Sequence, residues 1–345
     1  MKTYHVIGLM SGTSLDGLDI AYCQFNLESN NYSFQLLESD HIPYNAKWKE
    51  RLINAIHLNN EDLHALDIEY GEWMANQVNI FKQNFNPKID FIASHGYTVF
   101  HAPEKGYTTQ IGDGKSMAKL TGNKIICDFR SMDVSLGGQG APLVPIGDRD
   151  LFNLSKDQVC VNIGGIANYT YLNEKVKGRD ICAANLVLNK LANQINLEFD
   201  EDGQIAAANN IDLKILKQLN SLEFEGALEA ISLHEAYFSI LNLSLLSVEE
   251  KIATCTLHIA HKIAEAIAPY KNAFITGGGA LNKHLIGLIQ SISNTKIIIP
   301  SKNIIEFKEA IIFAYLGILK NENKVNCLAS VTGASHDNTG GVIYQ

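Results

Sequence analysis

The hydrophobic residues of this chain fall into short apolar runs that alternate with longer stretches of helical spacing. The short runs, bounded by glycine or polar turns, predict strands at 4–10, 18–26, 89–93, 124–128, 159–163, 167–172, 273–276 and 297–299. Apolar positions spaced three and four apart predict helices at about 48–85, 116–121, 183–196, 204–219, 247–268 and 307–319. Strands that alternate with helices predict an α/β protein.

Two glycine-containing turns each join a pair of the predicted strands. Residues 11–17 form the first turn, close to the start of the chain, and Gly164-Gly165 form the second. The sequences around the two turns are not an internal repeat. The shared strand–turn–strand pattern nevertheless indicates a duplicated architecture.

The length and composition of the chain fit a protein of two lobes. With 345 residues, of which 46% are hydrophobic and 19% charged, the chain can bury a large core, so we do not expect a disordered protein. We predict an N-terminal lobe of residues 1–130 plus 331–345 and a C-terminal lobe of residues 131–330. The glycine-rich stretch 137–142 marks the predicted crossing between them.

The charge and the cysteines of the chain indicate which partners and which compartment to expect. Lys and Arg number 28 against 37 Asp and Glu, so the formal charge is -9 and no basic face is available for nucleic acid. The six cysteines lie far apart, without metal-ligand spacing, and are expected to be reduced thiols. The apolar run at 6–10 is too short for a signal peptide, and no run is long enough to span a membrane. We expect a cytoplasmic protein without a membrane partner.

The first turn has the chemistry that a triphosphate needs. Glycines let the backbone approach phosphate, hydroxyls can donate to its oxygens, and carboxylates such as Asp16 can hold a hydrated Mg2+. The candidate nucleotide-binding residues here are Gly12, Thr13, Ser14, Leu15, Asp16, Gly17, Leu18 and Asp19. An ordinary tight hairpin is the alternative, and the segment is not a P-loop because G-x-x-x-x-G-K-[ST] is absent.

Two further glycine segments complete a candidate ATP site. Gly164 and Gly165 would form a second phosphate clamp, although a plain hairpin explains them equally well. The triple glycine Gly277, Gly278 and Gly279 follows a predicted buried strand and precedes a helix, which suits close approach of the backbone to adenine and ribose. Three such segments in this order indicate a nucleotide-binding protein.

The ordered motifs of the chain resemble those of the anhydro-N-acetylmuramic acid kinases, across nearly its whole length. The motifs are Met10–Gly17, Ser94-His95-Gly96, Gln110–Asp113, Asp128-Phe129-Arg130, Asp133, Gly137–Pro145, Asn162–Asn168 and Thr276–Ala280. The resemblance implies a two-lobed actin-like ATPase fold, ribonuclease H-like, with a nucleotide cleft between the lobes. It also implies Mg-ATP-dependent opening of a 1,6-anhydro amino sugar with phosphorylation at O6, as in cell-wall recycling, and a homodimer.

The resemblance assigns the catalytic base to Asp180. The family's Gly-Phe-Asp-Thr-Gly-Pro-x-Asn stretch matches residues 178–185, so Asp180 stands where the base that activates water is expected. A solvated Asp in a loop before a helix is the alternative. The family's Gly-Pro is replaced by Cys182-Ala183 and a later acid by Asn189, which puts the shape of the sugar pocket in doubt. Residues 221–230 also lack the family's Lys-Ser-Thr-Gly-Arg-Glu pattern.

Four residues are candidates for contact with the sugar. Arg130 could bind a lactyl carboxylate and Asp133 sugar hydroxyls, although a salt bridge could explain both. His95 ends a strand and could equally be a structural hydrogen-bonding residue. Glu309 matches a family Glu near the sugar or metal, or it is a solvated helix residue. A kinase of another anhydro sugar, such as levoglucosan, and a non-catalytic nucleotide-binding sensor are the rival functions.

Overall fold

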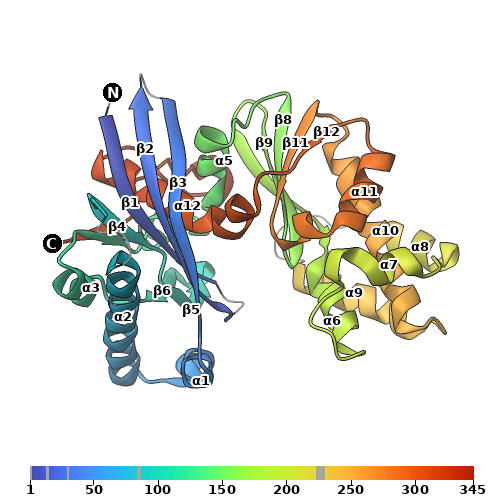
Figure 1. The fold of residues 1–345 in the computed structure, drawn as a ribbon, viewed down its shortest axis with the longest axis horizontal. Helices are drawn as coiled ribbons and strands as arrows, with labels where there is room; N and C mark the ends of the chain where they lie inside the picture. Colours follow the sequence, from blue (N-terminus) through green and yellow to red (C-terminus); the bar gives the residue numbers. More distant parts are fainter. Residues whose placement is uncertain (1, 13–14, 29–30, 84–86, 223–229) are drawn as a thin grey trace. The chain divides into compact units, whose positions relative to one another are not determined.

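The computed structural model describes residues 2–12, 15–28, 31–83, 87–222 and 230–345. The chain forms two compact units, Met1–Leu151 with Phe307–Gln345, and Phe152–Glu306, here called unit 1 and unit 2 (Figure 1). Among the described residues no helix is both long and apolar enough to cross a membrane.

Unit 1 is built on a six-stranded mixed sheet. Its order is β13-β7-β4-β1-β2-β3, with β1 (Lys2–Ser11), β2 (Gly17–Glu28), β3 (Asn31–Pro43), β4 (Phe91–Ser94), β7 (Ile125–Cys127) and β13 (Val342–Tyr344). β1, β2 and β3 are successive antiparallel neighbours, whereas β4 lies parallel to β1 and β7 parallel to β4. The strands β5 (Tyr97–Ala102) and β6 (Tyr107–Ile111) form a separate hairpin.

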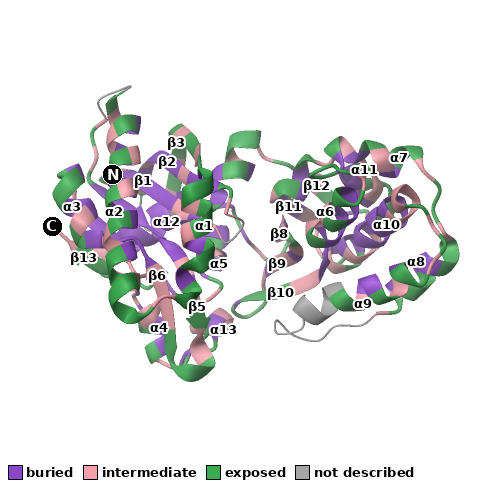
Figure 2. Cartoon of the chain, turned by 90° about the horizontal axis from the view of Figure 1, so that it is seen from below, coloured by how far each residue is buried: buried purple, intermediate pink, exposed green. Residues whose placement is uncertain are grey.

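Helices lie on both faces of this sheet. The helices of unit 1 are α1 (Ala46–Asn54), α2 (Asn60–Gln83), α3 (Gly114–Thr121), α4 (Ser131–Ser135), α5 (Val144–Leu151), α12 (Lys302–Asn321) and α13 (Ala329–Thr332). On one face Ile7 and Leu9 pack with Tyr70 and Met74 of α2. On the other face α12 lies so close that a Cβ on Gly8 would come within 1.9 Å of the Ala310 carbonyl oxygen. The strands are accordingly the buried centre of the unit (Figure 2).

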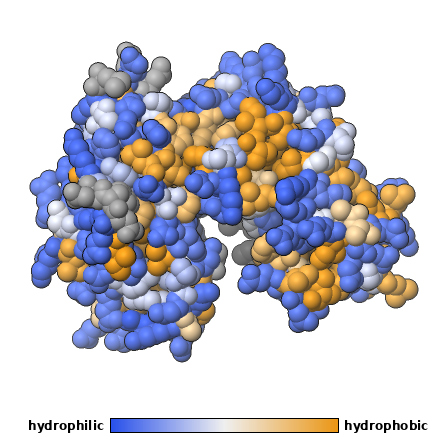
Figure 3. Space-filling model, viewed as in Figure 1, coloured by the Kyte–Doolittle hydropathy of each residue, from blue (hydrophilic) through white to orange (hydrophobic). Residues whose placement is uncertain are grey.

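Unit 2 carries a five-stranded sheet in the order β10-β9-β8-β11-β12. Its strands are β8 (Gln158–Ile163), β9 (Ile166–Leu172), β10 (Val176–Ala183), β11 (Asn272–Thr276) and β12 (Lys296–Ile298). Its helices are α6 (Asn185–Asn193), α7 (Gln204–Ala208), α8 (Leu213–Asn220), α9 (Ala230–Asn242), α10 (Val248–Ile267) and α11 (Lys283–Ile292). Figure 3 shows hydrophobic residues on the viewed surface of this unit, and Leu213, Leu243 and Leu245 are exposed.

The two sheets share one topology. In each, the first strand is central, the next two strands extend the sheet antiparallel on one side, and two later strands extend it parallel on the other. Unit 1 adds a sixth strand, β13, antiparallel to β7 at the edge. This is the ribonuclease H-like strand order, present twice. The predicted α/β fold class of a two-lobed actin-like ATPase is thereby confirmed, and the duplication indicated by the two glycine turns is seen in the topology.

The unit boundaries differ from the lobes predicted at 1–130 plus 331–345 and at 131–330. Residues 131–151 and 307–330 belong to unit 1. The reason lies in packing, because α12 covers the first sheet at Gly8 and a buried ion pair, Lys308 Nζ to Asp148 Oδ1 at 2.7 Å, joins α12 to α5.

Candidate active site

In unit 2 the glycine segments meet at one edge of the sheet. β8 and β11 are parallel neighbours, so the Gly164-Gly165 turn and the loop Gly277–Gly279 follow from the carboxyl ends of adjacent strands. In α/β sheets, ligands bind outside the carboxyl ends of the strands. We call these two segments together the glycine edge.

Chain packing requires two of the three glycines at 277–279. A Cβ on Gly277, whose φ is +81°, would lie 2.7 Å from the Ile163 carbonyl oxygen, and one on Gly279 would lie 2.2 Å from Ile163 Cγ2. Gly278 is exposed, and a Cβ there would meet only Asn185 Nδ2 at 3.7 Å. Gly165 is similarly open. Gly165 and Gly278 therefore present accessible backbone to a ligand, whereas Gly277 and Gly279 bring the loop against β8.

The beginning of α6 is bonded to the same edge. The backbone N–H groups of Ala184 and Asn185 donate to the carbonyl oxygens of Gly165 and Gly164, at 2.8 and 3.1 Å. The Asn185 side chain donates to the Ile163 carbonyl oxygen at 3.2 Å. Asn185, which ends the family-like stretch 178–185, thus fixes the geometry of the Gly164-Gly165 turn.

Asp180 lies on β10, opposite Asn168 of β9, at a β-bulge between Asp180 and Cys182. Bulges next to active sites re-aim a side chain. The Asp180 carboxylate is half-buried, and no described residue donates a hydrogen bond to it or pairs with it. Partial desolvation raises its pKa above the ordinary value of an aspartic acid. The alternative of a solvated loop Asp is wrong, because Asp180 is part of a strand.

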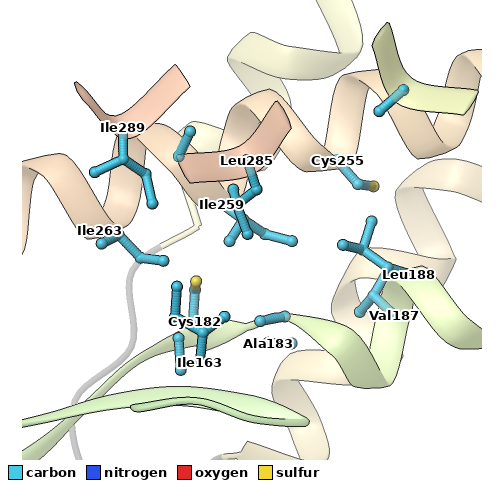
Figure 4. Packing of buried hydrophobic residues seen from close by; sticks show 14 of the residues in the cluster. Ile163, Cys182, Ala183, Val187, Leu188, Cys255, Ile259, Ile263, Leu285 and Ile289 are labelled. Atoms are coloured by element: carbon cyan, nitrogen blue, oxygen red, sulfur yellow. The ribbon is translucent and has the colours of Figure 1, made fainter. Parts of the chain in front are cut away.

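Cys182 and Ala183 point into the hydrophobic core of unit 2. Both are fully buried, and Figure 4 shows them among Ile163, Ile259 and Val187. Burial raises the pKa of the Cys182 thiol to about 12. The departure from the family's Gly-Pro therefore changes the packing beneath the strand rather than a surface that a sugar could touch.

A buried hydrogen-bonded chain supports the end of β10. The Ala183 backbone hydrogen-bonds to the Tyr237 hydroxyl, which lies 2.7 Å from His258 Nε2, and His258 Nδ1 lies 2.6 Å from Asn220 Oδ1. Because an amide oxygen only accepts, Nδ1 carries the proton and Tyr237 donates to Nε2. Burial, with Lys262 and His261 nearby, lowers the pKa of His258 to about 3.

We expect this histidine to make folding stability depend on pH. As the pH falls below 6.5, the ordinary histidine pKa, the unfolded chain takes up a proton that folded His258 does not, so stability falls by about 1.4 kcal/mol per pH unit. In His258→Gln the thermal midpoint should drop less steeply between pH 6.5 and 4.5, as measured by scanning calorimetry. The exposed His57→Gln should keep the wild-type slope. Equal slopes in all three proteins would contradict the assignment.

In unit 1 the first turn connects β1 to β2 beside the end of β4. Leu9 of β1 pairs with Ser94 of the parallel β4, which places the turn and His95 at the same edge of the sheet. Thr13 and Ser14 lie outside the described residues. The side chains of Leu15 and Leu18 pack into the core, so only their backbone could face a phosphate.

The acidic residues of the turn differ in their surroundings. Asp16 is exposed, and its carboxylate accepts from the Gly17 N–H at 2.9 Å. Asp19 is half-buried, and its Oδ1 lies 2.7 Å from His41 Nδ1. Gly17 packs against β3, because a Cβ there would come within 2.4 Å of the Ile42 carbonyl oxygen.

Two tyrosines hold the beginning of the turn. The hydroxyls of Ser11, Tyr44 and Tyr70 are in mutual hydrogen-bonding contact, with Ser11 to Tyr70 at 2.6 Å and Tyr44 to Tyr70 at 2.5 Å. The Tyr44 N–H also donates to the Asp16 carbonyl oxygen at 3.1 Å. Tyr44 thus contacts both flanks of the turn. No pattern in the sequence marks this role, since the contacts join segments far apart in the chain.

His95 and Arg130 belong to one hydrogen-bonded network. His95 Nδ1 donates to its neighbouring Gly96 carbonyl oxygen at 2.8 Å, and Arg130 Nε donates to His95 Nε2 at 2.9 Å. Arg130 Nη1 donates to the Gly140 carbonyl oxygen at 2.6 Å. Burial and Arg130 lower the pKa of His95 to about 3, so the ring is neutral. The alternative of a structural histidine fits: both ring nitrogens are used, and His95 orients Arg130.

Glu309 on α12 is an accessible residue whose carboxylate lies in the electrostatic field of this group. Desolvation and the carboxylates of Asp19 and Asp16 raise its pKa, while Arg130 and Lys308 lower it. Burial lowers the pKa of Arg130, and Glu309 opposes that effect. Glu309 therefore belongs to the same polar surface as Arg130 and the first turn.

Asp133 does not face this surface, which corrects its prediction as a sugar ligand. Its side chain is fully buried. One carboxylate oxygen accepts from the Gly140 N–H at 2.8 Å, and the other accepts from Cys327 Sγ, Thr332 Oγ1 and Asn338 Nδ2 at 3.0, 2.9 and 2.8 Å. The carboxylate instead ties α4 to α13 and the chain beyond it, and no described Lys, Arg or His forms a salt bridge with it.

The residues present fit a Mg-nucleotide better than a metal held by protein alone. Among the described residues there is no cluster of three or more side chains that could hold a metal ion. Mg2+ in kinases needs only one or two carboxylates, because phosphates and waters complete its shell. Asp16, Asp19 and Glu309 offer such carboxylates.

Comparison with known proteins identifies the family. The family model for anhydro-N-acetylmuramic acid kinase matches residues 4–345. The chain is 38% identical to the anhydro-N-acetylmuramic acid kinase of Shewanella denitrificans, over 97% of this chain and 96% of that protein. The corresponding enzyme of Pseudomonas savastanoi is 32% identical over 99% of both chains.

The similarity to solved structures is lower than the sequence similarity to these relatives. A gluconate kinase from Lactobacillus acidophilus is 10% identical with a TM-score of 0.47, over 92% of this chain and 90% of that one. Such a score supports no conclusion about activity. The family match rests on sequence over the whole chain, and the chain belongs to the anhydro-N-acetylmuramic acid kinase family of ATP-dependent sugar kinases.

Proposed function

We propose that this protein uses Mg-ATP to open the 1,6-anhydro ring of anhydro-N-acetylmuramic acid and to phosphorylate O6, giving N-acetylmuramic acid 6-phosphate. The observation that carries the proposal is Asp180. It is an unpartnered, half-buried carboxylate with a raised pKa on a bulged strand, two strands from the glycine edge. A general base needs a free carboxylate with a pKa nearer to neutrality.

The reaction assigns a clear task to Asp180. The carboxylate takes a proton from water as the water oxygen bonds to C1 of the sugar. The C1–O6 bond breaks, and O6 bonds to the γ-phosphorus as the bridging oxygen leaves with ADP. Atoms balance as sugar, ATP and water giving sugar phosphate, ADP and a proton. ATP supplies the phosphoryl group, and Mg2+ neutralises phosphate charge.

The chain's polar groups then bind and orient the reactants. In unit 2, exposed backbone at Gly165 and Gly278 would receive a nucleotide. In unit 1, considered by itself, Gly12 and Asp16 would suit phosphate and the metal. Arg130 keeps donors beyond the two that His95 and Gly140 accept, and these suit the lactyl carboxylate of the sugar.

A coupled ADP-release assay with 1,6-anhydro-N-acetylmuramic acid, followed by mass analysis of the product, tests the function. A product heavier than the sugar by one phosphoryl group plus one water supports it. ADP release only with levoglucosan would show that levoglucosan is the substrate instead. The position of Cys182 in the core gives no support to a remodelled sugar pocket. ATP binding without turnover of any sugar would favour a sensor.

Replacing Gly12 with valine should weaken ATP binding by about tenfold or more. Gly12 follows Ser11 directly, and its carbonyl oxygen accepts from the Leu15 N–H at 3.4 Å, so a branched side chain would crowd the phosphates at the turn. Isothermal titration calorimetry with a non-hydrolysable ATP analogue measures the effect. Gly287→Val, at an exposed position of α11 where a Cβ would meet no atom of the described residues within 4 Å, is a control for general effects of the substitution. An unchanged dissociation constant in Gly12→Val would remove the turn from the nucleotide site.

We further propose that the protein is a homodimer acting in the cytoplasm, where its phosphoryl donor is found. Six free cysteines are consistent with a reducing compartment. Light scattering coupled to size-exclusion chromatography tests the dimer, and a monomer mass would overturn it.

A further inference from the structure

We propose that Asn168 is a positioning residue for the attacking water, which it holds against the Asp180 carboxylate. The inference rests on the proposed function, because it concerns the same hydrolytic step. Within the motif Asn162–Asn168, the sequence assigns a role to Gly164 and Gly165 and none to Asn168 itself.

The register of the unit 2 sheet places three polar side chains in one row. Asn162 of β8 is directly opposite Asn168 of β9, and Asn168 is directly opposite Asp180 of β10. Side chains of directly opposite residues lie on the same face of a sheet, with Cβ atoms about 5 Å apart. The row therefore runs across three adjacent strands.

The row occupies the face of the sheet that is turned away from the apolar core. The residues that flank it along the strands, Val161, Ile163 and Ala167, are fully buried in the hydrophobic cluster of unit 2. Because successive side chains alternate between faces, the polar row projects to the other side. Asn162, Asn168 and Asp180 are all half-buried, as expected for the wall of a site.

One end of the row lies at the glycine edge, and the other end is the proposed base, Asp180. At one end, a Cβ on Gly277 would come within 2.7 Å of Asn162 Oδ1, and a Cβ on Gly164 within 3.2 Å of Asn162 Nδ2, so Asn162 touches the glycine edge. At the other end is Asp180. With strands about 4.8 Å apart, the two ends are about 10 Å from each other, and Asn168 lies at the midpoint.

The Asn168 carboxamide is available for a ligand. No described residue forms a hydrogen bond with its side chain, and the same is true of Asp180. A carboxamide offers both donors and an acceptor. A water bound to the Asp180 carboxylate at about 2.8 Å would therefore be within reach of the neighbouring Asn168 side chain, about one strand spacing away.

In the reaction, Asn168 would fix the direction of attack. The water gives its proton to Asp180 while its oxygen bonds to C1 and the C1–O6 bond breaks. Asn168 neither gains nor loses a proton. It holds the water oxygen so that one lone pair faces C1, and a misplaced nucleophile costs about 10²-fold in rate.

The test is a steady-state comparison of Asn168→Ala and Asn168→Ser with wild type on 1,6-anhydro-N-acetylmuramic acid. We expect Asn168→Ala to lower kcat about 10²-fold with KM for ATP and sugar within about twofold, because the residue acts on water. Asn168→Ser, which keeps a hydroxyl on the same face, should recover part of the loss. Asn173→Ala, at the exposed far end of the same hairpin, should match wild type.

The outcomes separate this inference from the function on which it rests. If Asn168→Ala keeps the wild-type kcat while Asp180→Asn is inactive, the inference fails and the kinase assignment stands. If KM for the sugar rises and kcat is unchanged, Asn168 binds sugar and the inference also fails. A loss of kcat equal in the alanine and serine variants, with lowered thermal midpoints in both, would show a structural role and overturn it.

Discussion

Replacing Asp180 with asparagine should lower turnover of the anhydro sugar by about 10³-fold and leave ATP affinity within about twofold. Asparagine keeps the shape of the side chain but cannot accept the proton of the attacking water. No described residue forms a hydrogen bond or ion pair with the carboxylate, so the exchange breaks no polar interaction with that part of the protein. Mass spectrometry of the sugar phosphate and calorimetric titration of an ATP analogue measure the two quantities.

A control variant and the pH dependence of kcat provide two further tests of this prediction. Asp157→Asn changes an exposed ion pair with Lys271 in the same unit and should leave kcat unchanged. Because desolvation raises the pKa of Asp180, the acidic limb of the wild-type kcat profile should lie above pH 3.9, the ordinary value for Asp. An Asp180→Asn enzyme with more than a tenth of wild-type turnover would remove Asp180 as the base.

Replacing Arg130 with lysine should raise KM for 1,6-anhydro-N-acetylmuramic acid about 30-fold, equivalent to about 2 kcal/mol. Lysine keeps the charge but loses the planar fork that can bond His95, Gly140 and a carboxylate together. The decisive comparison uses 1,6-anhydro-N-acetylglucosamine, which lacks the lactyl carboxylate. Its KM should change much less.

Steady-state kinetics on the two sugars also show how this assignment could fail. An equal rise in KM for both would mean that Arg130 supports the site without contacting the lactyl group. Arg149→Lys, at a partly exposed Arg paired with its neighbour Asp150, is the matched control and should leave both values unchanged.

The sequence predicted the central strands of both sheets and the edge strand β12, but it missed the edge strands β3, β10 and β13. The strands around the two glycine turns are apolar and buried, so their pattern is strong, and β1, β8 and β9 lie where predicted. The pattern predicts neither β3 nor β10, each at one edge of its sheet. Edge strands carry polar side chains, as Lys177 and Arg179 show on β10, and so lack an apolar signal.

The sequence predicted which residue types belong to the candidate site better than it predicted whether each side chain is exposed or buried. The motif that contains Asp133 reads as ligand chemistry, yet that carboxylate is buried among four donors that come partly from the end of the chain. Leu18 and Cys182 likewise lie within functional motifs, but their side chains point into the hydrophobic cores of their units. Which side of a strand faces the core depends on register, and register emerges only from the assembled sheet.

The interrupted path of the chain through unit 1 has a consequence for how the protein is made. During synthesis the first 151 residues leave the ribosome without α12 and β13, so one face of their sheet lacks the helix that packs on β1, and β7 lacks its edge partner. Unit 2 is continuous in sequence and can fold as soon as residue 306 has emerged. The unit synthesised first is thus completed last, and in the interval its exposed strands are the part of the nascent chain most in need of chaperone protection.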